Sequence, residues 1–363
     1  MSRNYYLYEL QILNMAKQLT NTNDLILEFI KANPLLSSKE IHDGLTIEIS
    51  YATLKRTLQA LISENLVLPK GKGKATKYQL SEGYGLLQKI DISEYFQKEI
   101  DERNVHESFN HSLITNTLST VSVFTGEEFN HLDNLQKKYA ENISRLTDTE
   151  YNKELERLAI DLSWKSSQIE GNTYSLLETE RLLKEKEEAK GKTKEEAIML
   201  LNHKKALDFI IVNPKYVTPL SVHSIEDIHS LLIGELNIER NIRKGIVRIT
   251  GTNYKPLDNE HQIREALEDM CVLVNMQREV FSKALLVLVL LSYIQPFEDG
   301  NKRTARIISN AILLDNGYCP ISFRTIDSIE YKKAMLLFYE QNNITAFKRI
   351  FIDQFEFAVK TYF

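Results

Sequence analysis

The chain of 363 residues is poor in cysteine, proline and glycine, with 2, 7 and 13 of them respectively. Its cysteines, Cys271 and Cys319, lie far apart in apolar surroundings, which excludes a disulfide-rich framework and predicts buried thiols. Few prolines and glycines among abundant Leu, Ile, Lys and Glu favour helices over a turn-rich β fold. The net charge of −5 gives no whole-chain case for nucleic acid, so charge has to be considered segment by segment.

Long hydrophobic runs are also missing. The longest, residues 284–294, is too short to span a bilayer and predicts no membrane partner. Residues 1–9 are polar and tyrosine-rich, without a signal-peptide pattern. Since buried thiols suit a reducing compartment, we expect a cytoplasmic protein.

What the sequence does contain is helical spacing, which predicts a mainly α fold with short β features. Segment 245–256 breaks the pattern by alternating residue types, and predicts a short hairpin or flap. Residues 91–147 are mixed and polar and give no clear boundaries. The predicted C-terminal helices cover 150–170, 176–190, 193–211, 222–235, 260–276, 279–293, 300–316, 327–340 and 344–361.

Residues 21–81 show the pattern of a separate unit, within a predicted first domain at 1–88. Three helices are expected, with starts at Asn23 or Asp24, at Ser37 or Ser38, and at Ser50. Two short strands joined by a Gly/Lys loop follow at 66–80. This order is that of a winged helix-turn-helix.

The same unit is locally basic, since residues 50–80 hold six basic side chains against one acidic residue, Glu64. The start of the third helix and the lysine loop are where such domains contact base edges and phosphates. Docking of a protein, including a second copy in a homodimer, is the alternative. The candidate DNA contacts are Tyr51, Thr53, Lys55, Arg56, Lys72 and Lys74.

The most informative stretch begins where an apolar helix ends at Pro296. Gly300 lets the backbone approach a ligand closely, and the free N–H groups of the helix that begins there form an anion site. Basic side chains at 302, 303 and 306 add positive charge, and the carboxylate of Asp299 could hold Mg²⁺ between phosphate oxygens. The alternative is a charged helix start with surface ion pairs.

Residues 295–306 read Gln-Pro-Phe-Glu-Asp-Gly-Asn-Lys-Arg-Thr-Ala-Arg. This resembles the Fic (Fido) signature His-Pro-Phe-x-Asp/Glu-Gly-Asn-Gly/Lys-Arg-x-x-Arg at every defined position except the first. The resemblance covers most of residues 140–360. It implies a Fic-type helical bundle with a short β-hairpin flap, divided into a helical region at 89–218 and a Fic core at 219–363.

Fic domains usually transfer AMP from ATP to a hydroxyl side chain of a target protein. The resemblance implies that Asp299 coordinates Mg²⁺ and that Arg306 binds the terminal phosphate. It assigns the phosphate cradle to Gly300, Asn301, Lys302 and Arg303. It assigns alignment of the target segment, by strand-like pairing, to Val247, Arg248, Ile249, Thr250 and Tyr254.

The family's histidine is the general base, and Gln295 takes its place here. A carboxamide cannot accept the hydroxyl proton, and losing a general base costs roughly 10² to 10⁴ in rate. We therefore expect retained ATP binding with impaired transfer. One alternative is an ATP-sensing regulator that binds DNA, and another is transfer of a phosphate or choline group. Gln295 is either the natural residue or an introduced substitution. His223 and His229 are expected to be structural or surface residues.

Residues 166–171 resemble the family's inhibitory motif Ser/Thr-x-x-x-Glu-Gly/Asn. Ser166 and Glu170 take its defined positions, and Gly171 makes a suitable helix C-cap. The resemblance implies that the Glu170 carboxylate pairs with Arg306 in place of the γ-phosphate. An exposed glutamate before a turn is the alternative. The position of the motif before the core implies the class with an N-terminal inhibitory helix.

Overall fold

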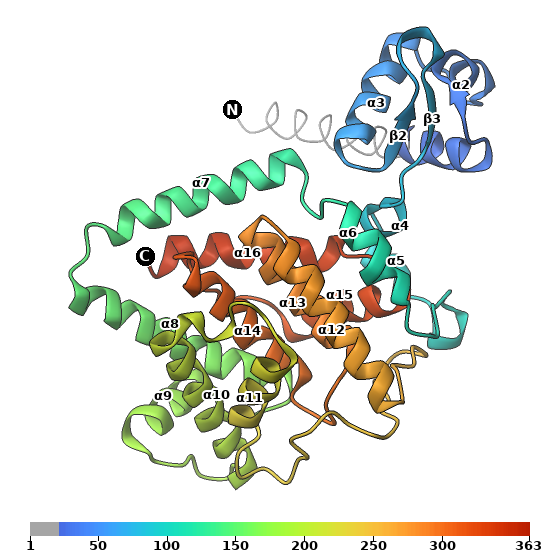
Figure 1. The fold of residues 1–363 in the computed structure, drawn as a ribbon. Coiled ribbons are helices and arrows are strands. Elements are labelled where there is room, and N and C mark those ends of the chain that lie inside the picture. Colours follow the sequence, from blue (N-terminus) through green and yellow to red (C-terminus); the bar gives the residue numbers. More distant parts are fainter. Residues whose placement is uncertain (1–21) are drawn as a thin grey trace, which may run out of the picture. The chain divides into compact units, whose positions relative to one another are not determined.

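The computed structural model describes residues 22–363, which separate between Gln88 and Lys89 into two compact units (Figure 1). We refer to residues 22–88 as unit 1 and to residues 89–363 as unit 2. No helix in either described unit is both long enough and apolar enough to cross a bilayer.

Unit 1 combines helices with one small antiparallel sheet. The central strand β3 pairs with β1 on one side and β2 on the other, with Leu36 opposite Tyr78 and Val67 opposite Leu80. After helical residues 22–32, its elements are β1 (Leu36–Ser37), α2 (Ser38–Gly44), α3 (Tyr51–Ser63), β2 (Val67–Lys70), the 3-10 turn η1 (Gly73–Ala75), β3 (Lys77–Leu80) and α4 (Tyr84–Leu87).

Two of the three predicted helix starts in unit 1 are confirmed. The Ser37 hydroxyl accepts from the N–H of Glu40, and the Ser50 hydroxyl accepts from the N–H of Thr53, so both serines are N-caps. The first start is wrong, because the helix already contains residue 22. The two predicted strands are present. The identification as a winged helix-turn-helix stays a prediction.

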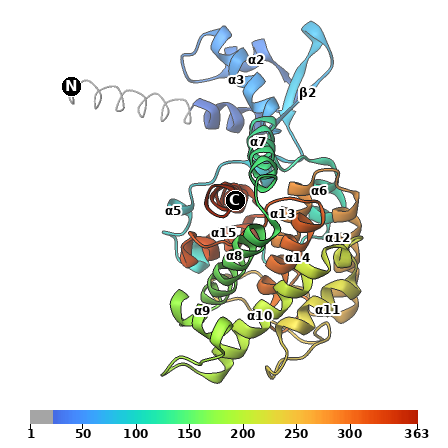
Figure 2. The same cartoon turned by 90° about the vertical axis from the view of Figure 1, so that its left-hand side faces the viewer.

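Unit 2 is helical, which confirms the mainly α prediction; within residues 89–363 its only bridge joins Ser108 to Lys255. Figure 2 shows its helices stacked around α13 and α14. The elements are α5 (Ile92–Tyr95), η2 (Ile100–Glu102), the π-helix η3 (Leu113–Thr117), α6 (Leu118–Thr120), α7 (Gly126–Ile143), α8 (Asp148–Ile169), α9 (Leu176–Glu185), α10 (Lys194–Val212), η4 (Pro214–Val217), α11 (Val222–Leu232), α12 (Glu260–Met276), α13 (Val280–Ile294), α14 (Asn301–Asp315), α15 (Ser328–Gln341) and α16 (Thr345–Thr361).

Helix α13 forms the centre of unit 2 because it is apolar on all sides, and a helix of that kind is stable only when buried. It packs against α12, α14, α15 and α16, and α14 also contacts α8, α10 and α11. The 295–300 loop between α13 and α14 is therefore fixed at both ends by the core. The two cysteines are buried free thiols, as predicted, and burial raises the pKa of Cys271 to about 12.

Two parts of unit 2 differ from the sequence predictions. Segment 245–256 is not a hairpin: it forms a turn at 250–251 and an isolated bridge from Lys255 to Ser108, because two short strands with no sheet beside them are marginally stable. The sequence analysis also missed the 18-residue helix α7. Its signal was the capping box in which Thr125 and Glu128 accept each other's backbone N–H groups.

Candidate functional site

The loop between α13 and α14 leaves the start of α14 with backbone N–H groups that are unpaired within residues 22–363. Gln295 ends α13 with φ +52, and Gly300 precedes α14 with φ +82. Within the described chain, the backbone N–H groups of residues 301–303 have no hydrogen-bond acceptor. Unpaired N–H groups and the positive end of the helix dipole favour an anion at this position.

The amides of Gln295 and Asn301 hold the loop in shape. Asn301 Nδ2 donates to Gln295 Oε1 at 2.9 Å and to Phe297 O at 2.8 Å, while Asn301 Oδ1 accepts from Phe297 N at 2.9 Å. Gln295 Nε2 donates to Ser292 O at 2.6 Å. The predicted cradle residue Asn301 therefore uses its side chain inside the loop, and only its backbone N–H is left for a ligand.

Two further residues support the loop, and the sequence analysis did not assign them this role. Arg243 donates from Nε to Gln295 O at 2.6 Å and from its backbone N to Pro296 O at 3.0 Å. The ring of His229 stacks on Phe297, with centroids 3.6 Å apart and planes 2° apart. No motif marks either residue, because their contacts join segments far apart in the sequence.

His229 is a neutral support for the loop. Its Nε2 lies 3.0 Å from Asp299 O, and burial lowers its pKa to about 4. A Cβ added to Gly300 would come within 3.3 Å of the His229 ring. His229 is thus structural, as expected, while His223 is an exposed residue whose side chain is 83% accessible.

The carboxylate of Asp299 stands at the entrance of the loop. Its Oδ1 accepts from Gly300 N at 2.6 Å, and its Oδ2 accepts from Arg303 Nη2 at 2.9 Å. The side chain is 58% exposed, and each oxygen has a second lone pair. No group of three His, Cys, Asp or Glu side chains in the described chain could cage a metal. One exposed carboxylate fits Mg²⁺ that arrives with phosphate oxygens and water.

Glu170, at the end of α8, lies between two basic residues of α14. Arg306 Nη2 donates to Glu170 Oε1 at 2.7 Å, and Lys302 Nζ is 3.4 Å from Oε2. Burial alone raises the pKa of Glu170, but the charges of Lys302 and Arg306 outweigh it and lower that pKa to about 2. The carboxylate stays ionised at every pH above this value.

Arg306 is held on a second side by α8. Its Nε donates to Ser166 Oγ at 2.8 Å and its Nη2 to Ser166 O at 3.1 Å. The guanidinium is fully buried, yet Nη1 has no partner, and Arg303 likewise leaves Nε and Nη1 unpaired. Unpaired buried donors are costly, so these two arginines retain capacity for an anionic ligand.

A buried histidine, His203 on α10, lies near this charge cluster. Neither ring nitrogen has a partner. Burial, followed by the positive charges of Arg306 and Arg303, lowers its pKa well below the usual value. The imidazole of His203 is therefore neutral near pH 7 and adds no charge to the cluster.

The predicted target-aligning residues lie on one irregular segment. Arg248 and Thr250 are exposed and Val247 and Ile249 are half-buried. Tyr254 differs: it is 2% exposed, and its hydroxyl donates to a backbone oxygen of α13 at 2.9 Å. Its side chain therefore anchors the segment, and the other four predicted residues are at least partly accessible.

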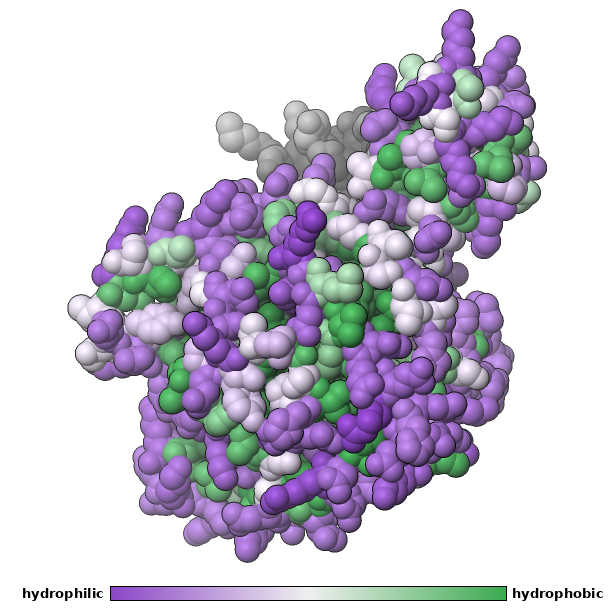
Figure 3. Space-filling view, in the orientation of Figure 1, coloured by the Kyte–Doolittle hydropathy of each residue, from purple (hydrophilic) through white to green (hydrophobic). Residues whose placement is uncertain are grey.

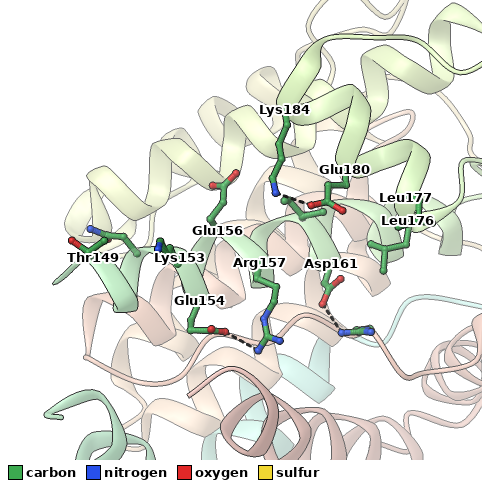
Figure 4. Close-up of a pocket in the computed structure, with 13 residues that line it drawn as sticks. Thr149, Lys153, Glu154, Glu156, Arg157, Asp161, Leu176, Leu177, Glu180 and Lys184 are labelled. Atoms are coloured by element: carbon green, nitrogen blue, oxygen red, sulfur yellow. Dashed lines mark hydrogen bonds and ion pairs between the residues drawn. The ribbon is translucent and has the colours of Figure 1, made fainter. Parts of the chain in front are cut away.

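A pocket of about 870 Å³ lies away from the 295–306 loop, between α8, α9 and Arg324 (Figure 4). Its charged side chains largely pair with one another, as in the Lys184–Glu180 and Asp161–Arg324 pairs. A second pocket of about 500 Å³ is lined by residues 236–241 and Glu298.

The predicted DNA contacts of unit 1 lie on its surface. Tyr51 is 44% exposed, and Lys55 Nζ lies 5.7 Å from the Tyr51 ring. Lys72 and Lys74 are exposed in the β2–β3 loop. Thr53 is only half-exposed, because both its N–H and its hydroxyl contact the Ser50 cap. Figure 3 shows hydrophilic side chains projecting from unit 1.

The loop lies in a region that matches a known family model. The model of the Fic/DOC family matches residues 219–313. These residues form a Fic/DOC family domain. The Fic/DOC domain contains the 295–306 loop, the support residues Arg243 and His229 and most of α14, whereas Glu170 lies outside it.

Relatives of this Fic/DOC-containing chain are found among characterised proteins. Protein adenylyltransferase Fic of Nematostella vectensis is 30% identical over 177 residues, which cover 46% of this chain and 40% of that protein. Protein adenylyltransferase fic-1 of Caenorhabditis briggsae is 28% identical over 172 residues, covering 45% and 33%. The chain thus matches less than half the length of these relatives.

Solved Fic structures share the fold. Fic-1 of C. elegans aligns with a TM-score of 0.56 and 21% identity over 65% of this chain and 71% of that chain. A Fic domain containing signaling protein from Bacteroides thetaiotaomicron aligns with a TM-score of 0.54 and 19% identity over 63% and 94%. At these identities the likeness establishes the architecture alone.

Proposed function

We propose that unit 2 binds a magnesium–ATP complex at the start of α14 and that its activity is transfer of AMP to a hydroxyl side chain of a target protein. In the chain as it stands, transfer is weak and inhibited by Glu170. The family match at 219–313 and the adenylyltransferase relatives support the reaction class. The residue roles rest on the geometry of the loop.

The observation that carries the proposal is the pair between Arg306 and Glu170. The fully buried guanidinium of Arg306, in the second turn of α14, is neutralised by a carboxylate 2.7 Å away. Carboxylate and phosphate make similar bidentate partners for arginine. Glu170 therefore occupies a position that suits a phosphate oxygen, and its removal frees both Arg306 and Lys302.

Transfer would form a bond from the target hydroxyl oxygen to the α-phosphorus and break the α-phosphorus bond to the pyrophosphate leaving group. The hydroxyl proton needs an acceptor. Gln295 cannot accept it, and both ends of its amide are occupied by Asn301 and Ser292. The loss of a general base accounts for roughly 10² to 10⁴ in rate. Mg²⁺ at Asp299 would neutralise phosphate charge.

The test compares four chains with labelled ATP and a cell extract as the source of targets: the unsubstituted chain, Glu170→Gly, Gln295→His, and the double variant. We expect strong incorporation only in the double variant, and little in Glu170→Gly alone. The exposed substitution Gln262→His on α12, combined with Glu170→Gly, is the matched control and should remain weak. Strong transfer by Glu170→Gly alone would refute the assignment of position 295.

Calorimetry separates nucleotide binding from chemistry. Glu170→Gly should bind magnesium–ATP, and Gln295→His should change that affinity by no more than about twofold, because it leaves the anion-binding groups intact. No binding by Glu170→Gly would overturn the proposed nucleotide site itself.

A second candidate function, DNA binding by unit 1, is favoured by a separate observation. Exposed basic side chains lie both on α3, at Lys55 and Arg56, and on the β2–β3 loop, at Lys72 and Lys74. Such a pair of basic elements suits contacts to a phosphate backbone. In this case the Fic/DOC domain would act as an ATP-responsive regulator.

Binding to a mixed-sequence DNA duplex, measured against salt, tests this candidate. Changing Lys72 and Lys74 to glutamate should weaken binding and reduce the salt slope by about 2, since each phosphate contact contributes about 0.9. Lys205→Glu with Lys332→Glu, two exposed lysines of unit 2, gives the same change in net charge and serves as control. Equal losses in both variants would exclude a specific role for the loop.

A further inference from the structure

Residues 95–108, here called the strap, contact residues 246–255, here called the flap. Lys255 N donates to Glu107 O at 2.7 Å, and Lys255 Nζ is 2.8 Å from Glu107 Oε2. These contacts fix the C-terminal end of the flap. Arg103 makes a separate hydrogen bond, to the turn of the flap at Gly251.

Arg103 joins three elements through one guanidinium. Its Nη1 donates to both carboxylate oxygens of Glu340 on α15, at 3.1 and 3.3 Å, and its Nη2 donates to Gly251 O at 3.1 Å. The side chains of Arg103 and Glu340 are 5% and 0% exposed. Tyr95 donates its hydroxyl to Glu340 at 2.7 Å, and the guanidinium lies 5.1 Å from the Phe96 ring.

Burying the Arg103–Glu340 ion pair costs desolvation free energy. Apolar side chains of similar size would attach the strap to α15 without that cost. Arg103 has a further N–H group, on Nη2, that donates to the flap turn, and an apolar pair would lack this donor. Gly251 has φ +91, a conformation that L residues rarely adopt, and its carbonyl is the acceptor. The pair thus determines where the turn lies.

The flap is secured at its turn and at its C-terminal end, but its first part is unpaired. Tyr254 stacks on Tyr293 of α13 with centroids 4.8 Å apart. In contrast, the backbone N–H groups of residues 246–250 have no acceptor within residues 22–363. A segment with unpaired backbone N–H groups, held at its turn and at its C-terminal end, is suited to pair with an extended chain.

We propose that Arg103 is a positioning residue whose clamp with Glu340 holds the flap turn so that residues 246–250 present their free backbone to an extended segment of the target. The clamp should affect affinity for the target and leave affinity for magnesium–ATP unchanged. The part of this proposal that concerns a target rests on the proposed function, whereas the part in which the clamp holds the flap does not.

Trypsin cleavage after the exposed Arg248 measures flap opening without nucleotide or target. The clamp is weakened by Arg103→Lys, because one ammonium cannot reproduce the planar fork, and removed without leaving a lone charge by Arg103→Gln with Glu340→Gln. Arg349→Ala, at an arginine with an 85% exposed side chain on α16, is the control. Since cleavage tracks the open population, we expect an increase of about fivefold or more for the double variant, a smaller one for Arg103→Lys, and none for the control.

Unchanged cleavage at Arg248 in both clamp variants would overturn the proposal, as would equally faster cleavage in α8 and α12, which would indicate general destabilisation. Calorimetry in the Glu170→Gly background should show magnesium–ATP affinity within about twofold of the parent; a parallel loss of that affinity would also count against a flap-specific role. If no chain binds nucleotide, the proposed function fails while the cleavage result still decides the clamp.

A kinetic readout addresses the target. In the Gln295→His, Glu170→Gly chain, a library of extended Ser-, Thr- and Tyr-containing peptides serves as acceptor. The clamp variants should raise KM for the best peptide by about tenfold with little change in kcat, as expected for a lost contribution to substrate binding. A fall in kcat at constant KM would contradict the assigned role.

Discussion

Replacing Glu170 with glutamine should change how the stability of unit 2 depends on pH. The two side chains have the same shape, and both can accept from Arg306, but only glutamate is charged. The pKa of Glu170 is lowered from 4.5 to about 2 in the folded chain. A depressed carboxyl pKa stabilises the folded state above the unfolded pKa, and this stabilisation is lost as pH falls through the folded pKa.

The size of the effect follows from the shift. A pKa lowered from 4.5 to about 2 corresponds to about 3 kcal/mol of unfolding free energy above roughly pH 6, of which roughly half should be lost by about pH 3.5. The side chain of Glu170 is 15% exposed, so screening by solvent is limited. The glutamine variant lacks this titration.

The chain offers a built-in reporter for the measurement. Its single tryptophan, Trp164, lies on α8 before Glu170 and donates from Nε1 to Tyr174 O at 3.0 Å. Urea unfolding followed by Trp164 fluorescence at about pH 6.5 and pH 3.5 gives the free-energy difference between the two chains at each pH. Glu195→Gln, at an exposed position on α10, controls for loss of a charge.

We expect the advantage of glutamate over glutamine in unfolding free energy to shrink by about 1–2 kcal/mol between these pH values. A difference that stays constant would show that Glu170 is not held ionised by Lys302 and Arg306. The proposed competition between this carboxylate and a phosphate would then lose its electrostatic basis.

Two further substitutions test the local structure by the same unfolding measurement. Gly300→Ala should destabilise unit 2 by about 1–2 kcal/mol through its positive φ alone, plus a contribution from the contact with His229. Gly191→Ala has a similar φ of +78 and open space around it, so an equal effect in both would exclude the contact. Thr125→Ala should cost about 1 kcal/mol by removing the cap of α7, whereas no loss would mean that the reciprocal bond with Glu128 is not needed.

The sequence predicted much of the fold because local signals and burial agreed. Helix α13 was evident from its continuous apolar run, and α3 from the cap at Ser50 followed by helical spacing. The hairpin at 245–256 was wrong for the converse reason: alternation alone does not form strands where no sheet extends beside them. Helix α7 was missed because its mean composition is polar, although its capping box was visible.

The candidate site likewise has residues that the sequence indicated and residues that it did not. The 295–306 loop was identified from contiguous residues, since a glycine, a carboxylate and basic side chains at a helix start carry their chemistry in their order. Its supports, Arg243 and His229, were not found, because their bonds reach across 52 and 70 residues of sequence. Nor does sequence order indicate that Asn301 and Gln295 bind each other rather than a ligand.

The amino-acid order by itself determined the glycine and the basic side chains at the start of α14, the amide at position 295 and the basic character of unit 1, because each depends on residue types within a short span. Tertiary structure alone decided that Arg243 supports the loop at Gln295, that His203 lies near the charges of Arg303 and Arg306, and that Arg103 reaches Gly251. The physical reason is that charge and hydrogen bonding act over a few ångströms in space, and only packing brings distant segments that close.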